Sequence, residues 1–287
     1  MMTQKNSVRP SPIAGTWYSA NQSQLANTVD RYIESADIPE LPGDVIAVVA
    51  PHAGYRYSGA VAGHAYKCVK GMAFDTVVVL SPMHQYYPQN LLTSAHSAYH
   101  TPLGDIPLAT GLLAEINDTL ESQANLSLTP VSNDQEHSLE IELPFLQRAL
   151  RGEFKLVPIM LRTQQRQIAQ MLGEILAEIM QDKSCLMVAS SDLSHFYPEP
   201  TANRLDKQVL SALADFSPEK LFDLKDSGEG QACGLAAIAS VLWASESLGA
   251  TDVTLLKYDT SASTTGDRSS VVGYGAAAVT RPTDQLP

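Results

Sequence analysis

Three histidines each follow an apolar run that ends in a short turn. His52 comes after residues 45–50 and Pro51, His84 closes a Ser-Pro-Met-His turn, and His195 closes the stretch Ser-Ser-Asp-Leu-Ser-His. A neutral imidazole is the commonest metal ligand, and a turn fixed to a strand supports such a ligand rigidly. One loop histidine is weak evidence, but three in equivalent places favour a shared metal or proton-transfer site.

Cys233 is a further candidate ligand because it precedes Gly234 and an apolar stretch, 235–245, that predicts a helix. Amide donors and the dipole at a helix start stabilise a thiolate. Most free cysteines are simply small buried side chains, and that interpretation would hold for Cys233 alone. Together with His52 and His84, it makes a His-His-Cys metal site a plausible hypothesis. The other cysteines fall in predicted regular elements and are expected in the core: Cys68 and Cys185.

Asp192 and His195 are three residues apart beyond a predicted strand. We expect the carboxylate to orient the imidazole ring, which would suit a proton-transfer pair near a metal or a carbonyl group. The alternative is an Asx-type turn beside a surface histidine. His137 and Glu140 share one face of a predicted helix, an arrangement that is common on solvent-exposed helices. The remaining histidines have no comparable context: His64, His96 and His100.

The elements that must position these residues alternate between strands and helices. Residues 45–50 suit a strand buried on both faces of a sheet, which Pro51 ends. Further strands are predicted at 74–80, 154–161, 185–190, 253–258 and 270–279. Pro158 assigns its strand to a sheet edge or a bulge. If the strands before the histidines run parallel, their carboxyl ends share one edge, with neighbours about 5 Å apart, where open α/β sheets hold ligands.

Helical periodicity is found between the strands, at 22–35, 61–69, 108–121, 133–150, 164–180, 204–224 and 235–245. In the stretch 133–150, Asn133 or Asp134 is the expected N-cap, and Pro144 should kink or restart the helix. Residues 85–107 read as a loop. The pattern predicts a single α/β domain over 1–287, with a central, mostly parallel or mixed sheet flanked by helices.

Composition narrows the class of partner. The 287 residues are 44% apolar and 17% charged, as in soluble globular proteins. A net charge of −12 and a pI near 4.9 argue against nucleic-acid or anionic-membrane binding, since no basic surplus exists. There is no apolar run of membrane-spanning length and no secretory leader, and the three cysteines suggest reduced thiols. We therefore expect a cytoplasmic protein.

Several motifs together resemble the Memo family. They are Pro-His-Ala-Gly-Tyr-Arg-Tyr-Ser-Gly at 51–59, Glu-His-Ser-Leu-Glu-Ile-Glu-Leu-Pro-Phe-Leu-Gln at 136–147, the stretch 190–195 and the pair Cys233-Gly234. The lead Ala-Gly-Thr-Trp-Tyr at 14–18 and the closing segment 265–274 also resemble bacterial members, those of the AmmeMemoRadiSam system. The match covers nearly the whole chain, and the motifs are specific as a set.

This resemblance implies a fold like that of the class III extradiol ring-cleaving dioxygenases, which hold non-haem Fe(II) with two histidines and a carboxylate. In Memo proteins a cysteine takes the carboxylate position. Carried over by motif, the metal ligands would be His52, His84 and Cys233, and the acid/base residue would be His195, with Asp192 beside it. Residues implied to line the same cleft, as substrate-binding groups, are Tyr18, Tyr55 and His137. Glu142 departs from the glutamine expected in relatives, but touches no proposed ligand.

The leading hypothesis is a cytoplasmic protein that holds Fe(II), or else copper or zinc, and carries out redox or dioxygenase-type chemistry on a small aromatic or carbonyl substrate. Thiolate softens the site and favours Cu(I) or zinc without excluding iron. The alternative is a non-catalytic module whose cleft captures a peptide or partner protein, with Arg56 and Arg268 supplying charge for any phosphate. Zinc hydrolysis is a third alternative. The resemblance also implies partners, an AMMECR-type protein and a radical-SAM enzyme.

Overall fold

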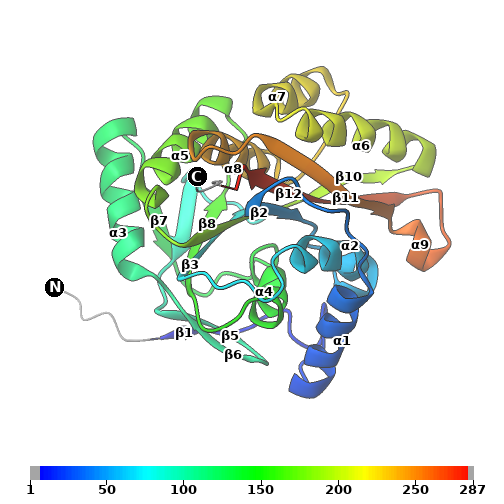
Figure 1. The fold of residues 1–287 in the computed structure, drawn as a ribbon, viewed down its shortest axis with the longest axis horizontal. Coiled ribbons are helices and arrows are strands. Elements are labelled where there is room, and N and C mark those ends of the chain that lie inside the picture. Colours follow the sequence, from blue (N-terminus) through cyan, green and yellow to red (C-terminus); the bar gives the residue numbers. More distant parts are fainter. Residues whose placement is uncertain (1–6, 284–287) are drawn as a thin grey trace.

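Nine strands form one mixed sheet through the middle of the computed structural model, which describes residues 7–283 (Figure 1). In sheet order they are β10 (Asp192–Tyr197), β12 (Val271–Arg281), β2 (Asp44–Ala50), β9 (Cys185–Ser190), β3 (Thr76–Pro82), β8 (Lys155–Leu161), β4 (Leu91–Ser94) and β7 (Leu128–Val131), with β11 (Asp252–Thr260) paired to β12. The central strands β2, β9, β3 and β8 are parallel, and β12 joins β2 antiparallel. The predicted α/β class with a mixed sheet is confirmed.

The three strands that precede the histidines of interest are consecutive in this sheet. β9 pairs in parallel with β2 on one side and with β3 on the other. Their carboxyl ends therefore share one edge, as predicted. Because β9 separates β2 from β3, His52 and His84 do not extend from neighbouring strands, and the turns after these strands must close the gap.

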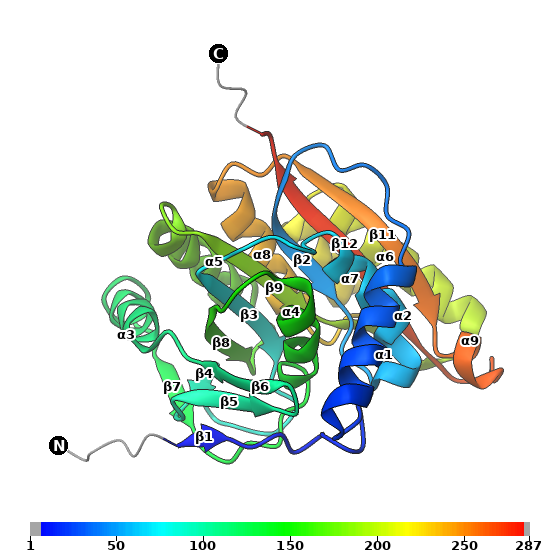
Figure 2. The same cartoon turned by 60° about the horizontal axis from the view of Figure 1, so that its bottom comes forward.

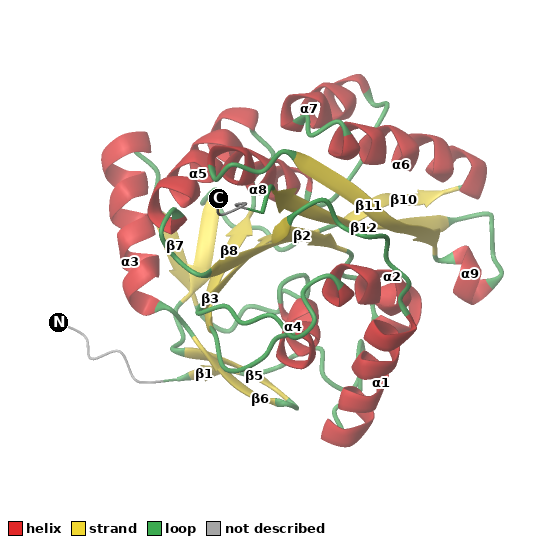
Figure 3. Ribbon diagram, in the orientation of Figure 1, coloured by secondary structure: helices red, strands yellow, loops and turns green. Residues whose placement is uncertain are grey.

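Helices cover both faces of the sheet (Figures 1 and 3). One face carries α5 (Arg166–Met180), α6 (Glu199–Ala214), α7 (Pro218–Ser227) and α8 (Leu235–Ser247); the other carries α1 (Gln22–Ser35), α2 (Tyr55–Lys67) and α4 (Leu143–Ala149). Shorter or peripheral helices are α3 (Thr110–Thr119), the π-helix η1 (Leu120–Ala124), the 3-10 helix η2 (Glu140–Glu142) and α9 (Ala262–Thr265). No helix in the described range 7–283 is long and apolar enough to cross a membrane.

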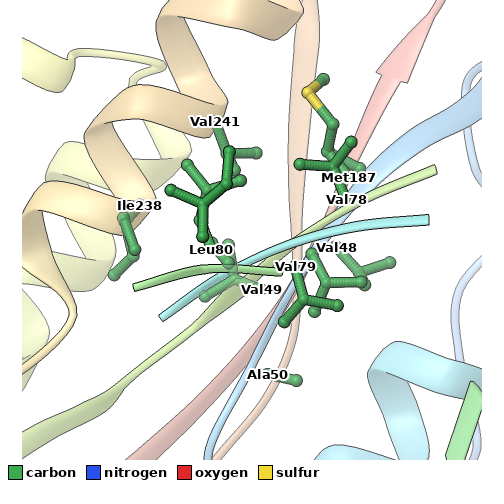
Figure 4. Packing of buried hydrophobic residues seen from close by; sticks show 14 of the residues in the cluster. Val48, Val49, Ala50, Val78, Val79, Leu80, Met187, Ile238 and Val241 are labelled. Atoms are coloured by element: carbon green, nitrogen blue, oxygen red, sulfur yellow. The ribbon is translucent and has the colours of Figure 1, made fainter. Parts of the chain in front are cut away.

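One part of the core lies between the parallel strands and α8, and another lies on the opposite face of the sheet (Figure 4). Val48, Val78 and Leu80 are completely buried, and Ile238 and Val241 of α8 pack in the same cluster. β-branched side chains suit strands that are buried on both faces, and a helix that is apolar all round must itself be buried. Tight packing of α8 therefore determines where the residues just before it lie.

The prediction that Pro158 marks an edge or a bulge was wrong, because β8 lies inside the sheet between β3 and β4. β4 pairs with β8 only at Leu91 and Leu92, and the Pro158 carbonyl accepts a hydrogen bond from Thr93 Oγ1 at 2.7 Å. The N–H and C=O of one strand residue point to the same side, so the missing N–H faces β4 beyond the backbone ladder. The proline consequently costs no ladder hydrogen bond.

Two further expectations were wrong. The predicted loop 85–107 contains β4 and two other short strands, β5 (Ala98–Thr101) and β6 (Gly104–Pro107), which form a small sheet with β1 (Val8–Arg9) at the end of the molecule away from α6 (Figure 2). The predicted helix 133–150 is irregular up to Leu139 and becomes α4 only at Leu143, where Pro144 occupies the first turn. Contacts with residues that are distant in the sequence, among them Arg9 and His84, hold the irregular stretch up to Leu139.

Candidate metal centre

His52, His84 and Cys233 converge at the carboxyl edge of the sheet. One ligand atom from each residue lies within 4.8 Å of the others, and Cys233 Sγ is 3.1 Å from His52 Nε2. The two imidazole rings meet edge to face, with their centroids 5.5 Å apart. The turns after β2 and β3 and the loop before α8 supply these groups, so the fold brings together the three residues that motif and spacing singled out.

His52 is held on two sides. Its backbone N–H donates to Asp192 Oδ1 at 2.8 Å, and its ring Nδ1 lies 2.9 Å from Ser190 Oγ. The residue is 1% exposed, and this burial, reinforced by nearby His137 and His84, lowers the pKa of His52 well below its usual value. The ring is therefore neutral at neutral pH, the form that binds metal.

His84 rests on a buried carboxylate that the sequence analysis missed. Glu136 accepts the His84 backbone N–H at 2.6 Å and lies 2.9 Å from its ring Nδ1. It also accepts the amides of His137 and Ser138, both at 2.9 Å. Burial would raise the pKa of Glu136, but the hydrogen bond to His84 and the nearby His137 outweigh it and hold that pKa well below its usual value. Such carboxylate–histidine pairs orient metal ligands.

Cys233 lies just before α8, next to its N-cap residue Gly234. Its Sγ accepts the Asp192 backbone N–H at 3.3 Å. A Cβ added to Gly234 would stand 2.3 Å from the Ser190 carbonyl oxygen, so only glycine allows this close approach. Burial, with Asp192 nearby, raises the pKa of the Cys233 thiol. The expected stabilisation of a thiolate by the helix start is thus outweighed by desolvation.

The predicted Asp192–His195 pair does not form in the way expected. No hydrogen bond joins the two side chains, and Asp192 instead supports the His52 backbone. Burial raises the pKa of Asp192 to about 7 and lowers that of His195. His195 itself lies on β10, an unpredicted strand, whose neighbouring Ser194 amide is held by buried Asp206 at 2.8 Å. Both predicted residues nonetheless face the same pocket.

A cavity of about 520 Å³ opens onto the cluster. Its lining includes four histidines and four larger aromatic side chains: His52, His84, His137, His195, Trp17, Tyr57, Phe196 and Tyr274. The His137 ring packs against two others: its centroid is 4.3 Å from that of Trp17, with the rings tilted by 38°, and 4.6 Å from that of His84, on which it stacks. Burial also lowers the pKa of His137 to about 4.

Tyr18 and Tyr55 do not line this cavity, which corrects the prediction that they do. Both are 5% exposed, and their hydroxyls donate inward, to Glu140 Oε1 at 2.7 Å and to the Ile141 carbonyl at 2.8 Å. Their chain neighbours Trp17 and Tyr57 take the cavity wall instead. The aromatic clusters in the sequence marked the right segments, while packing decided which ring faces the cavity.

Phe196 stands at the cavity mouth in a strained conformation. It is 75% exposed with φ of 64°, and the β10–β12 register shifts around it, between His195 and Tyr197. A left-handed backbone costs a bulky residue about 1–3 kcal/mol and is concentrated at functional sites. None of the cavity-lining residues is lysine or arginine. The wall is therefore aromatic and weakly charged.

The donor set fits a transition-metal ion. In each histidine one ring nitrogen is committed to a protein oxygen, from Ser190 or Glu136, which leaves the other for a ligand bond. Two imidazoles and a thiol match iron, copper or zinc better than a hard cation such as Mg²⁺. A second group of potential ligands, His84, Glu136 and His137, includes the carboxylate that already supports His84.

Comparison with known proteins gives a consistent result. Residues 9–278 match the family described as Memo-like protein. A MEMO1 family protein of Methanosarcina mazei is 34% identical over 278 residues, covering 95% of this chain and 99% of the relative. One from Nitrosopumilus maritimus is 32% identical over 273 residues, covering 94% and 98%. A solved structure of an uncharacterised Escherichia coli K12 protein shares the fold alone, with a TM-score of 0.54 and 14% identity over 81% of this chain and 98% of that one.

Proposed function

The chain belongs to the Memo-like family, and we propose that it is a metal-dependent redox protein acting on a small, uncharged aromatic or carbonyl compound. The observation that carries the proposal is the convergence of His52, His84 and Cys233 on a cavity with aromatic walls. Fe(II) is the proposed ion, with copper next, because both accept imidazole and thiolate ligands and change oxidation state. When bound, the ion would supply Lewis acidity and electron transfer.

The protein residues would divide the remaining work. Trp17, Tyr57 and Phe196 offer ring faces for a flat ligand, and their neutral surroundings favour an uncharged one. His195 faces the same cavity with a pKa lowered by burial, so its neutral ring can accept a proton from a ligand hydroxyl. Asp192, with a pKa of about 7, holds His52 and exchanges protons near neutral pH.

Anaerobic metal binding tests the proposal. We expect wild-type protein to bind one Fe(II) or Cu(I) and Cys233→Ala to bind at least about tenfold more weakly. Cys185→Ala is the matched control, because that free cysteine lies on the opposite end of β9. Equal affinity and stoichiometry in wild type and Cys233→Ala would eliminate the site. Oxygen uptake with a panel of catechols and small carbonyl compounds then tests for turnover.

A binding module is the second candidate, favoured by the exposed, strained Phe196 at the cavity mouth. In that case the aromatic wall would capture a side chain of a peptide or a partner protein, such as the AMMECR-type or radical-SAM partners predicted from the resemblance. The absence of lysine and arginine from the cavity wall argues for tyrosine over phosphotyrosine. Calorimetry with the two peptide forms, on wild type and Phe196→Ala, tests this. Metal-independent binding without oxygen uptake would support the module over the enzyme.

A further inference from the structure

Glu142 is a buried carboxyl group without a cationic partner. It is 1% exposed and forms no ion pair with any described residue. Two hydroxyl groups satisfy it instead: Tyr66 donates to Oε2 at 2.6 Å, and Ser190 donates to Oε1 at 2.7 Å. Burying a carboxyl group without a countercharge is costly, so its retention calls for a reason.

Ser190 connects this carboxyl group to the candidate metal centre. Its Oγ also lies 2.7 Å from the Ser138 carbonyl and 2.9 Å from His52 Nδ1. A hydroxyl has one proton, and the Ser138 carbonyl and an ionised Glu142 can both only accept it, so the proton goes to one of these two oxygens, of which the charged carboxylate is the stronger acceptor. The contact with His52 must then be donated by the ring. Nδ1 therefore carries the proton, and Nε2 is left bare beside Cys233 Sγ, at 3.1 Å.

We propose that Glu142 is a positioning residue for His52, acting through Ser190: the pair keeps Nε2 of the ring free for a ligand bond and, when Glu142 is ionised, places a negative charge behind it. The inference deepens the proposed function and rests on it for the identity of the bound group. Linked hydrogen bonds polarise one another in a buried setting, so a carboxylate one hydroxyl away strengthens Nε2 as an electron donor. A cation at the cluster is also the countercharge that Glu142 otherwise lacks.

Co(II) binding to metal-free protein measures the effect, with the Kd obtained by competition against a chromophoric chelator. Glu142→Gln conserves shape and removes the charge, and Ser190→Ala breaks the connection. Losing such an outer partner weakens metal binding about 10–100-fold. We expect a loss in that range for each single variant, and no further loss in the double variant, because both act through one path.

Tyr66→Phe is the matched control. It removes the other hydroxyl donor of Glu142 but retains the carboxyl group and its contact with Ser190, so its Kd should stay within about threefold of wild type. Near-UV circular dichroism confirms that each variant is folded. A Kd for Glu142→Gln within threefold of wild type, or single losses that multiply in the double variant, would overturn the proposal.

NMR of the metal-free protein gives a second readout that does not depend on the metal. At a pH of about 9, above the pKa of about 8 of Glu142, the ¹⁵N shifts of His52 should show an Nδ1-protonated ring. The Nδ1 proton resonance should move upfield in Glu142→Gln, and the ring should become a mixture of tautomers in Ser190→Ala. Unchanged resonances in both variants would refute the positioning role. If Cys233→Ala binds Co(II) as tightly as wild type, the proposed metal function fails while this readout still decides the inference.

Discussion

Two buried glutamates lie two residues apart in η2, and the protein satisfies them in opposite ways. Glu140 accepts from Arg9 Nη1 and from the Tyr18 hydroxyl, both at 2.7 Å. Glu142 accepts only from the hydroxyls of Tyr66 and Ser190. The first carboxylate is balanced by a buried guanidinium, whereas the second has no cation among the described residues. Glu140 thus stabilises the fold through an ion pair, whereas Glu142 is connected to the candidate metal centre.

The Arg9 network explains why residues 133–139 are held in place without forming a helix. Arg9 is 1% exposed and also forms an ion pair with Asp134 at 2.7 Å, while its Nη2 donates to the Glu136 carbonyl at 2.8 Å. It therefore ties β1 to the segment that carries Glu136 and His137. Because Trp17 follows β1 and packs against His137, this network also shapes the cavity wall.

Replacing Arg9 should have the largest effect on stability. Arg9→Met leaves Asp134 and Glu140 buried without a countercharge, and breaking a buried pair in this way costs about 3–5 kcal/mol. Urea unfolding at neutral pH measures the loss. Arg148→Met is the control, because its pair with Asp30 is about 40% exposed and contributes less than about 1 kcal/mol. Similar losses in the two variants would mean that the Arg9 network is not the anchor inferred here.

The effect of Glu142→Gln on stability should depend on pH, because no cation balances the charge of Glu142 when the group ionises. Burial raises the pKa of Glu142 to about 8, above the usual value of 4.5. The stability it contributes is complete below about pH 4.5 and is lost as pH rises through about 8. The free energy of unfolding of metal-free Glu142→Gln, relative to that of wild type, should therefore rise by about 2–4 kcal/mol between pH 5 and pH 9. Urea unfolding of both proteins at the two pH values measures the difference. A constant difference across this range would contradict the raised pKa.

The paired tyrosine variants should show the smallest effects. Tyr18→Phe removes one donor from Glu140, which retains Arg9, and should cost about 1 kcal/mol. Tyr66→Phe leaves Glu142 with a single donor and no cation, so we expect about 2 kcal/mol above pH 8. Thermal or urea unfolding resolves this order. The reverse order would show that the cation on Glu140 does not compensate for a lost hydroxyl.

The sequence identified those site residues that are marked by a local pattern in the chain. The apolar run that stops at Pro51 marked β2, and the turn after β3 marked His84 in the same way. The position of Cys233 before an apolar helix added a third candidate, which motif resemblance supported, and all three groups meet in the structure. Glu136 was missed although it adjoins His137, because nothing in a sequence shows that a carboxyl group will be buried beneath an imidazole that lies far away along the chain.

The sequence by itself determined the α/β class, the strands that precede His52, His84 and Asp192, and the family. These features follow from apolar periodicity and from motif order, both of which are local properties. Only the tertiary structure decided that Trp17 and Tyr57 face the cavity, that Asp192 supports His52 and not His195, and that Ser190 joins Glu142 to the centre. The reason is that a buried polar group takes whichever partner packing brings within hydrogen-bonding distance, and that partner can lie anywhere along the chain.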